Sequence, residues 1–134
     1  MRLRIAVLLI TLGLLGTDQA RLVAQGRGNQ TPTIRQLAWV ARSGDVQGTI
    51  GPRMTSILDP AISPDGSKVA VRGRMEQAET DHLYVLEGGS ANRLTDNEGA
   101  ERHMIWSPDG SRIAYSIQNQ GGVSNLYSRA ADGS

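Results

Sequence analysis

The sequence contains no cysteine and no phenylalanine, and only two Trp and three Tyr occur among its 134 residues. The lack of cysteine excludes disulfide bonds, thiolate metal sites, a cysteine nucleophile and a lipid-modified cysteine. The formal net charge is +1, and it falls to zero without the first 20 residues, which carry Arg2, Arg4 and Asp18. A charge this close to balance gives no electrostatic argument for a nucleic acid or an anionic membrane as partner.

Motifs for catalysis and cofactor binding are also missing. The sequence has no glycine-rich phosphate loop with lysine, no dinucleotide-binding fingerprint and no zinc-ligand pattern. The string nearest to the Gly-x-Ser-x-Gly elbow of serine hydrolases is Gly88-Gly89-Ser90-Ala91-Asn92, which ends in asparagine within an expected hairpin. Of the two histidines, we expect His82 on the polar surface, and His103 either lines a channel or lies in a solvated loop. We therefore expect no catalytic residue, metal ligand or cofactor.

The first 24 residues have the pattern of a secretory signal peptide. Two arginines precede the uncharged, mostly apolar run Ile5–Leu15, which is too short to span a bilayer as a helix. Ala20 and Ala24 are possible cleavage points, and the alternative is a buried N-terminal helix or strand. Residues 25–36 are rich in Gly, Asn, Gln and Thr and are expected to form a flexible linker. These features predict a periplasmic or secreted protein without a stable membrane span.

What the chain does contain is a repeated turn. Ser63-Pro64-Asp65-Gly66 is followed 44 residues later by Ser107-Pro108-Asp109-Gly110. Serine, proline and aspartate suit the first three positions of a type I turn, and glycine suits the position that closes it. Short apolar runs flank both copies, so each is expected to join two strands of a hairpin.

The repeat continues beyond the turn. Val69-Ala70-Val71 corresponds to Ile113-Ala114-Tyr115, and Leu83-Tyr84 corresponds to Leu126-Tyr127. A period near 44 residues is typical of a four-stranded propeller blade. We therefore predict an all-β fold, a partial β-propeller of about two four-stranded antiparallel blades. Residues 37–134 are expected to supply a half blade, a full blade over 60–95 and a partial blade over 104–134, whose open edges favour self-association.

These residues resemble the repeat of the TolB family of β-propellers. The matching segments are Trp106-Ser107-Pro108-Asp109-Gly110, Leu126-Tyr127 and Arg93-Leu94-Thr95, whereas Ile62 replaces the tryptophan in the earlier copy. The resemblance covers about residues 37–134. Similar blades occur in periplasmic TolB and in the N-terminal propellers of prolyl-oligopeptidase-like enzymes.

Two functional hypotheses follow from this resemblance. The first is an exported, non-enzymatic scaffold that binds a protein or peptide, and the resemblance implies a cell-envelope partner of the Tol–Pal kind. Its contacts would come from blade-linking loops at Arg53–Asp59 and Asp96–His103, in the second case through Asp96, Asn97, Glu98, Glu101, Arg102 and His103. The alternative is the N-terminal propeller of a prolyl-oligopeptidase-like serine peptidase, whose catalytic Ser, Asp and His would lie beyond Ser134. We favour the scaffold at this point, because every recognisable feature is architectural.

Overall fold

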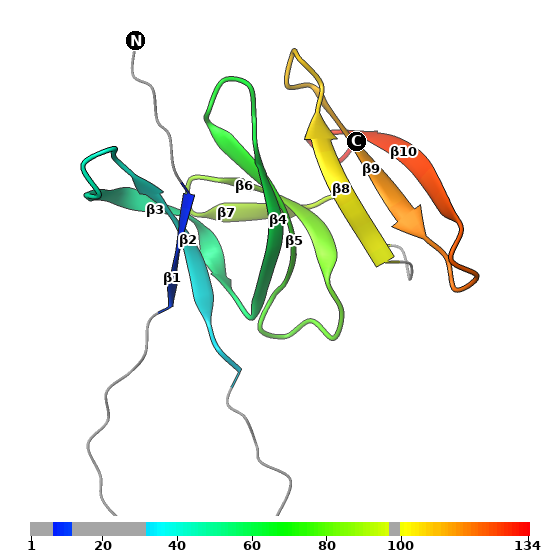
Figure 1. Cartoon of the computed structure of the whole chain (residues 1–134), viewed down its shortest axis with the longest axis horizontal. Helices are drawn as coiled ribbons and strands as arrows, with labels where there is room; N and C mark the ends of the chain where they lie inside the picture. The colour runs from blue at the N-terminus through cyan, green and yellow to red at the C-terminus, as the bar shows by residue number, and fades with distance from the viewer. Residues whose placement is uncertain (1–6, 12–31, 97–99) are drawn as a thin grey trace, which may run out of the picture.

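A computed structural model describes residues 7–11, 32–96 and 100–134, and within these ranges the chain is built from strands (Figure 1). The strands form three sheets in which every paired neighbour is antiparallel. The described residues form no helix, and so none that could cross a lipid bilayer. The prediction of an all-β, antiparallel fold is therefore confirmed.

The strands follow the chain from sheet to sheet. The first sheet has the order β1 (Val7–Thr11), β2 (Arg35–Val40), β3 (Val46–Met54). The second sheet has four strands, β4 (Ser56–Ile62), β5 (Lys68–Arg74), β6 (His82–Glu87) and β7 (Ser90–Arg93). The third contains β8 (Ala100–Trp106), β9 (Arg112–Gln118) and β10 (Ser124–Ala130), with β9 in the centre.

The N-terminal predictions fall largely outside the described residues. Of the expected signal peptide at 1–24, the structure describes only β1, which pairs with β2 from Val7 opposite Trp39 to Thr11 opposite Arg35. Of the expected linker at 25–36, the last two residues already belong to β2. The export leader therefore stays a prediction.

The second sheet carries the core, because both of its faces are covered. Strand side chains alternate between faces, so β5 sends Val69 and Val71 to one side and Ala70 to the other. The first side packs against the first sheet in a cluster of Leu37, Ile50, Met54, Ile57, Val69, Val71, Tyr84 and Leu86. The second side packs against the third sheet in a cluster of Ala70, Leu83, Val85, Leu94, Met104, Ile113, Tyr115 and Ala131. This two-sided burial explains why Val69–Val71 of β5 and Leu83–Leu86 of β6 are unbroken runs of apolar and aromatic residues.

Two segments expected to be loops are strands instead. Arg53 and Met54 end β3, and β4 begins at Ser56, so the expected linking loop Arg53–Asp59 reduces to Thr55. Likewise β8 begins at Ala100 rather than at Met104. Both strands contain a register irregularity, between Leu58 and Ala61 in β4 and between Arg102 and Ile105 in β8. A bulge admits residues that break the alternation of inward and outward side chains along a strand. This break is the reason why the sequence predicts loops in these two segments.

Candidate functional site

The two predicted turns are present and are closed by the same hydrogen bonds. Ser63 Oγ donates to Asp65 Oδ1 at 2.6 Å and accepts from the Lys68 amide at 2.9 Å. The Gly66 amide donates to the Ser63 carbonyl at 2.8 Å, and Gly66 has a φ of 73°, which favours glycine. Pro64 has no amide proton, and none of the hydrogen bonds that close the turn requires a donor at this position.

The second turn repeats this network. Ser107 Oγ donates to Asp109 Oδ1 at 2.6 Å and accepts from the Arg112 amide at 2.9 Å. Gly110, two residues after Pro108, has a φ of 72°. Hydrogen bonds from the neighbouring serines lower the pKa of Asp65 and of Asp109 to about 2. Both carboxylates are thus engaged in holding their turns, which leaves them as structural groups.

The most unusual backbone positions are Asp59 and His103. They are the non-glycine residues with positive φ among the described ranges, at 50° and 55°. They lie 44 residues apart, so they occupy the same place in the two repeats, inside the irregularities of β4 and β8. Non-glycine residues in this conformation are uncommon, and such strain tends to be kept at functional sites.

Each strained residue contacts the next strand of its sheet through the same repeat position. Asp59 Oδ2 lies 3.5 Å from Arg72 Nε, and His103 Nδ1 lies 3.3 Å from Ser116 Oγ. Arg72 and Ser116 are also 44 residues apart. The repeat therefore preserves a polar pair across the bulge but changes its chemistry, from a carboxylate and a guanidinium to an imidazole and a hydroxyl.

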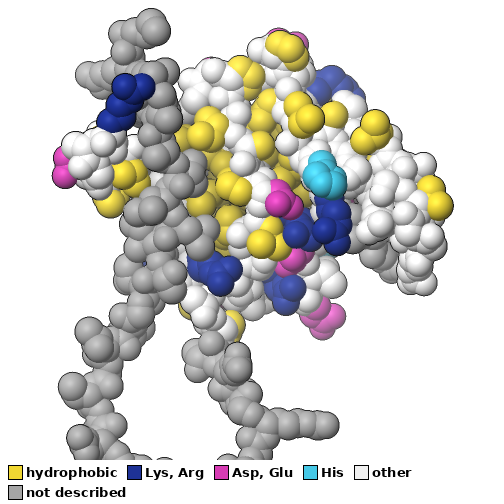
Figure 2. All heavy atoms as spheres, in the orientation of Figure 1, with side chains coloured by type: hydrophobic (Ala, Val, Ile, Leu, Met, Phe, Trp, Pro, Cys, Tyr) yellow, Lys and Arg dark blue, Asp and Glu magenta, His cyan; other side chains and the backbone are white. Residues whose placement is uncertain are grey.

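We call Asp59, Arg102 and His103 the edge tract, because they lie on β4 and β8, which are edge strands of neighbouring sheets. The two strands lie side by side (Figure 1), and the Trp106 indole of β8 donates to the Ala61 carbonyl of β4 at 2.9 Å. Figure 2 shows a histidine among basic and acidic side chains on the surface over these strands. The tract is thus a polar region on a face that also exposes hydrophobic side chains.

The contact between Ser116 and His103 is not a nucleophile activated by a base. Ser116 is buried, and its hydroxyl donates to the Arg102 carbonyl at 3.2 Å. A catalytic serine would be exposed at a tight turn with its proton directed to the base. The pair instead fixes the orientation of the imidazole, since Nδ1 donates to a hydroxyl whose own proton is already used.

The residues expected to form a partner-binding loop divide into three groups. Asp96 pairs with Arg93 at 2.9 Å, and Asn97 and Glu98 lie outside the described residues. Glu101, Arg102 and His103 belong to β8, so their assignment to a loop is wrong. Glu101 is moreover only 2% exposed and cannot meet a partner at the surface. The alternation along β8 turns it inward, a direction that polarity alone does not reveal.

His82 is also misplaced by the sequence prediction, because it is buried at 7% exposure rather than on the surface. Its Nε2 lies 2.9 Å from Thr80 Oγ1 and 3.0 Å from Arg93 Nη2. Burial and the nearby Arg93 guanidinium lower the pKa of His82. The neutral ring is therefore held between Thr80 and Arg93 as part of the structure.

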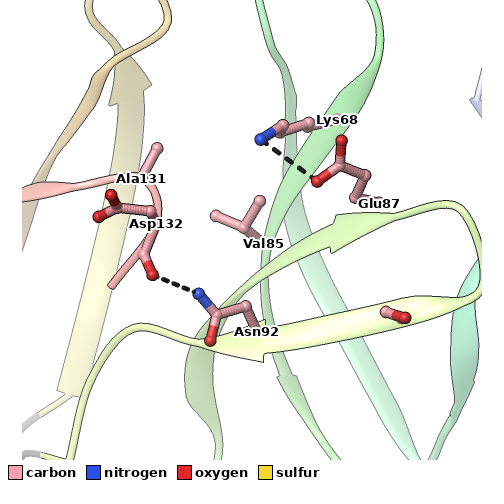
Figure 3. A pocket seen from close by; sticks show the side chains of 7 residues that line it. Lys68, Val85, Glu87, Asn92, Ala131 and Asp132 are labelled. Carbon is pink, nitrogen blue, oxygen red and sulfur yellow. Dashed lines mark hydrogen bonds and ion pairs between the residues drawn. The ribbon is translucent and has the colours of Figure 1, made fainter. Parts of the chain in front are cut away.

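A shallow pocket of about 230 Å³ lies between the second sheet and the C-terminal turn (Figure 3). Two of its charged groups are paired with each other, because Lys68 Nζ lies 3.2 Å from Glu87 Oε2. Across the pocket, Asn92 Nδ2 donates to the Asp132 carbonyl at 2.8 Å. In the ranges that the structure describes, no group of three or more His, Asp or Glu side chains is arranged to hold a metal ion.

Comparison with known proteins gives two informative relatives. Tricorn protease homolog 1 of Streptomyces coelicolor is 38% identical over 73 residues, which are 53% of this chain and 7% of that protein. The uncharacterized peptidase YuxL of Bacillus subtilis is 27% identical over 86 residues, which are 60% of this chain and 13% of that protein. This chain thus spans a small part of either relative. No protein-family model matches it.

These relatives correct the functional expectation. Both are named as peptidases, which overturns the hypothesis of a non-enzymatic scaffold and the expectation that the protein is not an enzyme. The alternative of a domain from a peptidase agrees better with them. The reason for the error is that the turn and strand residues specify an architecture, and one architecture serves proteins of different activity.

Proposed function

We propose that this chain is the β-propeller part of a peptidase, with TolB-type repeats as its blades and the cleavage chemistry carried by groups outside the described residues. The observation that supports this most directly is the similarity to two proteins named as peptidases. The described turns support it as well, since their serines and aspartates are bonded to one another rather than arranged for catalysis.

The assignment to a propeller is supported by the way the third sheet repeats the second. On the second sheet, Ala61, Ala70 and Leu83 face the third sheet. Their repeat counterparts Ile105, Ala114 and Leu126 are exposed, with Ile105 at 68% and Leu126 at 85%. A further blade would cover this exposed outer face of the third sheet, because radially stacked blades bury both faces of each sheet.

In this proposal the propeller admits peptides to the catalytic part. Blade edges such as β4 and β8 border the central channel of a propeller, so the edge tract would meet a substrate before cleavage. Loops and edges on a rigid scaffold are common places for such contacts. The substrate class that follows is peptides able to enter as extended chains.

The proposal is tested on the gene product that contains this sequence. We expect it to include a serine, histidine and aspartate set outside residues 1–134, to react with a fluorophosphonate probe and to hydrolyse blocked peptide amides. Replacing the labelled serine by alanine should abolish hydrolysis, while Ser116→Ala should leave it within about twofold, because Ser116 is placed here in a structural role. A gene product that hydrolyses no peptide, or whose activity depends on Ser116, would contradict the proposal.

The predicted leader makes this peptidase an exported one, and this part of the proposal has its own test. Cleavage after Ala20 or Ala24 would remove β1 and leave the edge of β2 open. N-terminal sequencing of the protein purified from the producing cells should therefore begin near residue 21 or 25. A mature protein that begins at Met1 would contradict export by this leader.

A further inference from the structure

A third turn of the chain has the same backbone form as the two Ser-Pro-Asp-Gly turns but lacks their first two residues. Residues 130–134 read Ala-Ala-Asp-Gly-Ser, so alanines stand where the earlier copies have serine and proline. The Gly133 amide donates to the Ala130 carbonyl at 3.1 Å, and Gly133 has a φ of 87°. The Ser134 amide donates to Asp132 Oδ1 at 3.0 Å, a bond that the first two turns also contain. The chain therefore presents the same turn three times with different side chains.

The third turn holds its carboxylate with fewer hydrogen bonds. In the first two turns the leading serine (Ser63 or Ser107) donates its hydroxyl proton to the aspartate at 2.6 Å. Ala130 stands at this position in the third turn and has no hydroxyl. Asp132 accepts from the amide and the hydroxyl of Ser134, and these bonds lower the pKa of its carboxyl. Since all three aspartates are exposed, the missing donor rather than access of water separates the third turn from the others.

An aspartate that precedes a glycine can rearrange without an enzyme. The glycine nitrogen forms a bond to the side-chain carboxyl carbon and loses its proton, while one carboxyl oxygen leaves as water. Water then adds to the resulting succinimide ring, and opening at the backbone carbonyl leaves isoaspartate, in which the main chain runs through the former side chain. Glycine favours this closure because it has no side chain to obstruct its nitrogen. The chain contains three Asp-Gly pairs, one in each turn, and no Asn-Gly pair.

Ring closure brings the carboxyl carbon to the glycine nitrogen, so a bond that fixes either group opposes the reaction. In the first two turns the leading serine fixes the carboxylate, and the proline that follows it restricts the backbone. The glycine amide lies 2.8 and 2.9 Å from its carbonyl acceptor in these turns, against 3.1 Å in the third. The third turn is therefore the least constrained of the three.

We propose that Asp132 is a site of spontaneous isoaspartate formation, and that the leading serines protect Asp65 and Asp109 from the same reaction. The modification changes a contact between sheets, because the Asp132 carbonyl accepts from Asn92 Nδ2 at 2.8 Å (Figure 3). In isoaspartate this carbonyl leaves the main chain and becomes a carboxylate, and the turn gains one backbone atom. The reaction needs no peptidase activity, so it is independent of the proposed function.

The test incubates the full chain at neutral pH in water enriched in heavy oxygen. Each hydrolysis of a succinimide adds one heavy oxygen at that aspartate, so mass spectrometry of peptides digested in ordinary water gives a rate for each pair. We expect Asp132 to react at least about fivefold faster than Asp65 and Asp109, because those two must first break a hydrogen bond to a charged group. Equal rates at the three sites, or the slowest rate at Asp132, would overturn the proposal.

Two matched variants exchange the protecting hydroxyl between turns. Ala130→Ser supplies the missing donor and should slow the reaction at Asp132 about fivefold. Ser107→Ala removes the donor and should accelerate the reaction at Asp109, while Asp132 in the same molecule serves as the unchanged reference. Thermal unfolding verifies that both variants are folded. In concentrated urea the three rates should converge, because the turns no longer exist there. An Ala130→Ser variant that reacts like the original chain, or rates that keep their order in urea, would contradict protection by the fold.

Discussion

The indole Nε1 of Trp106 donates a hydrogen bond of 2.9 Å to the carbonyl oxygen of Ala61, and this bond joins the second and third sheets at their edge strands. Ala61 lies in the irregular part of β4, where its carbonyl is available to a group from outside the sheet. Ile62, the repeat counterpart of Trp106, has no such donor and is exposed. The same repeat position therefore differs between the two copies, since Trp106 joins two sheets whereas Ile62 lies at the surface.

Trp106→Phe should lower the free energy of unfolding by about 1 kcal/mol, because it removes this hydrogen bond while keeping an aromatic ring in the cluster. Urea denaturation followed by circular dichroism measures the change. Trp39→Phe is the matched control, since the Trp39 indole makes no hydrogen bond within the described ranges. Equal losses in the two variants would show that the bond between the sheets contributes nothing.

Gly73→Ala should destabilise the fold by about 2 kcal/mol or more. A Cβ at this position would lie 2.5 Å from the Ser56 carbonyl oxygen and 2.6 Å from Met54 Cε, and the backbone oxygen cannot move aside cheaply. Gly89→Ala serves as the control, because its Cβ would meet nothing within 4 Å. Thermal unfolding of the two variants compares them, and similar midpoints would contradict the close approach of β4 to β5.

His103→Gly should be more stable than His103→Ala by about 1 kcal/mol, since the two variants differ only in the Cβ that is strained at a φ of 55°. In an ordinary strand the order is reversed, with alanine favoured by about 0.5–1 kcal/mol. Gly and Ala variants at Arg102 provide this reference within the same strand. The measurement is chemical denaturation of all four, and alanine favoured at both positions would exclude backbone strain at His103.

Acid should weaken the repeated turns through Asp65 and Asp109. Both carboxyls have a pKa of about 2 in the folded protein, against an ordinary value of 3.8. The ionised carboxylates therefore stabilise the folded state, and their whole contribution is present above about pH 3.8. This contribution is lost as the pH falls toward 2. Asp65→Asn with Asp109→Asn should therefore flatten the pH dependence of stability in this window.

The control for this experiment is Asp45→Asn, in a turn where the carboxylate accepts from Ser43 at 2.6 Å without the serine–aspartate–serine network of the repeats. Stability is followed by urea midpoints between pH 2 and pH 5. An unchanged slope in the double variant, or an equal change in the control, would show that these turns do not carry the acid sensitivity.

Leu126→Arg should reduce self-association of the chain without lowering its stability, because Leu126 is 85% exposed on the outer face of the third sheet. Sedimentation velocity over a range of protein concentrations measures this. Val46→Arg, at an apolar residue that is 54% exposed on the first hairpin, is the control. If both variants associate like the original chain, the outer face of the third sheet is not the contact.

The repeat was the part of this fold that could be predicted from local sequence. Pro64 and Gly66 restrict or permit backbone angles by their own chemistry, so the turn is readable without knowledge of the rest of the molecule. The strand over Val69–Val71 could be predicted as well, because three successive apolar residues follow the turn closely. The candidate site could not be predicted, because Asp59 and His103 are polar residues of the kind that usually occupies loops.

Sequence by itself determined the turns and most of the strands, because each depends on the conformational preferences and hydrophobicity of neighbouring residues. Tertiary structure alone decided that Glu101 points inward, that His82 is buried, and that Arg102 and His103 are exposed on β8. Those outcomes depend on strand register and on bulges, where a shift of one residue exchanges the two faces of a strand. Register is fixed by contacts between distant segments, and no local pattern records it.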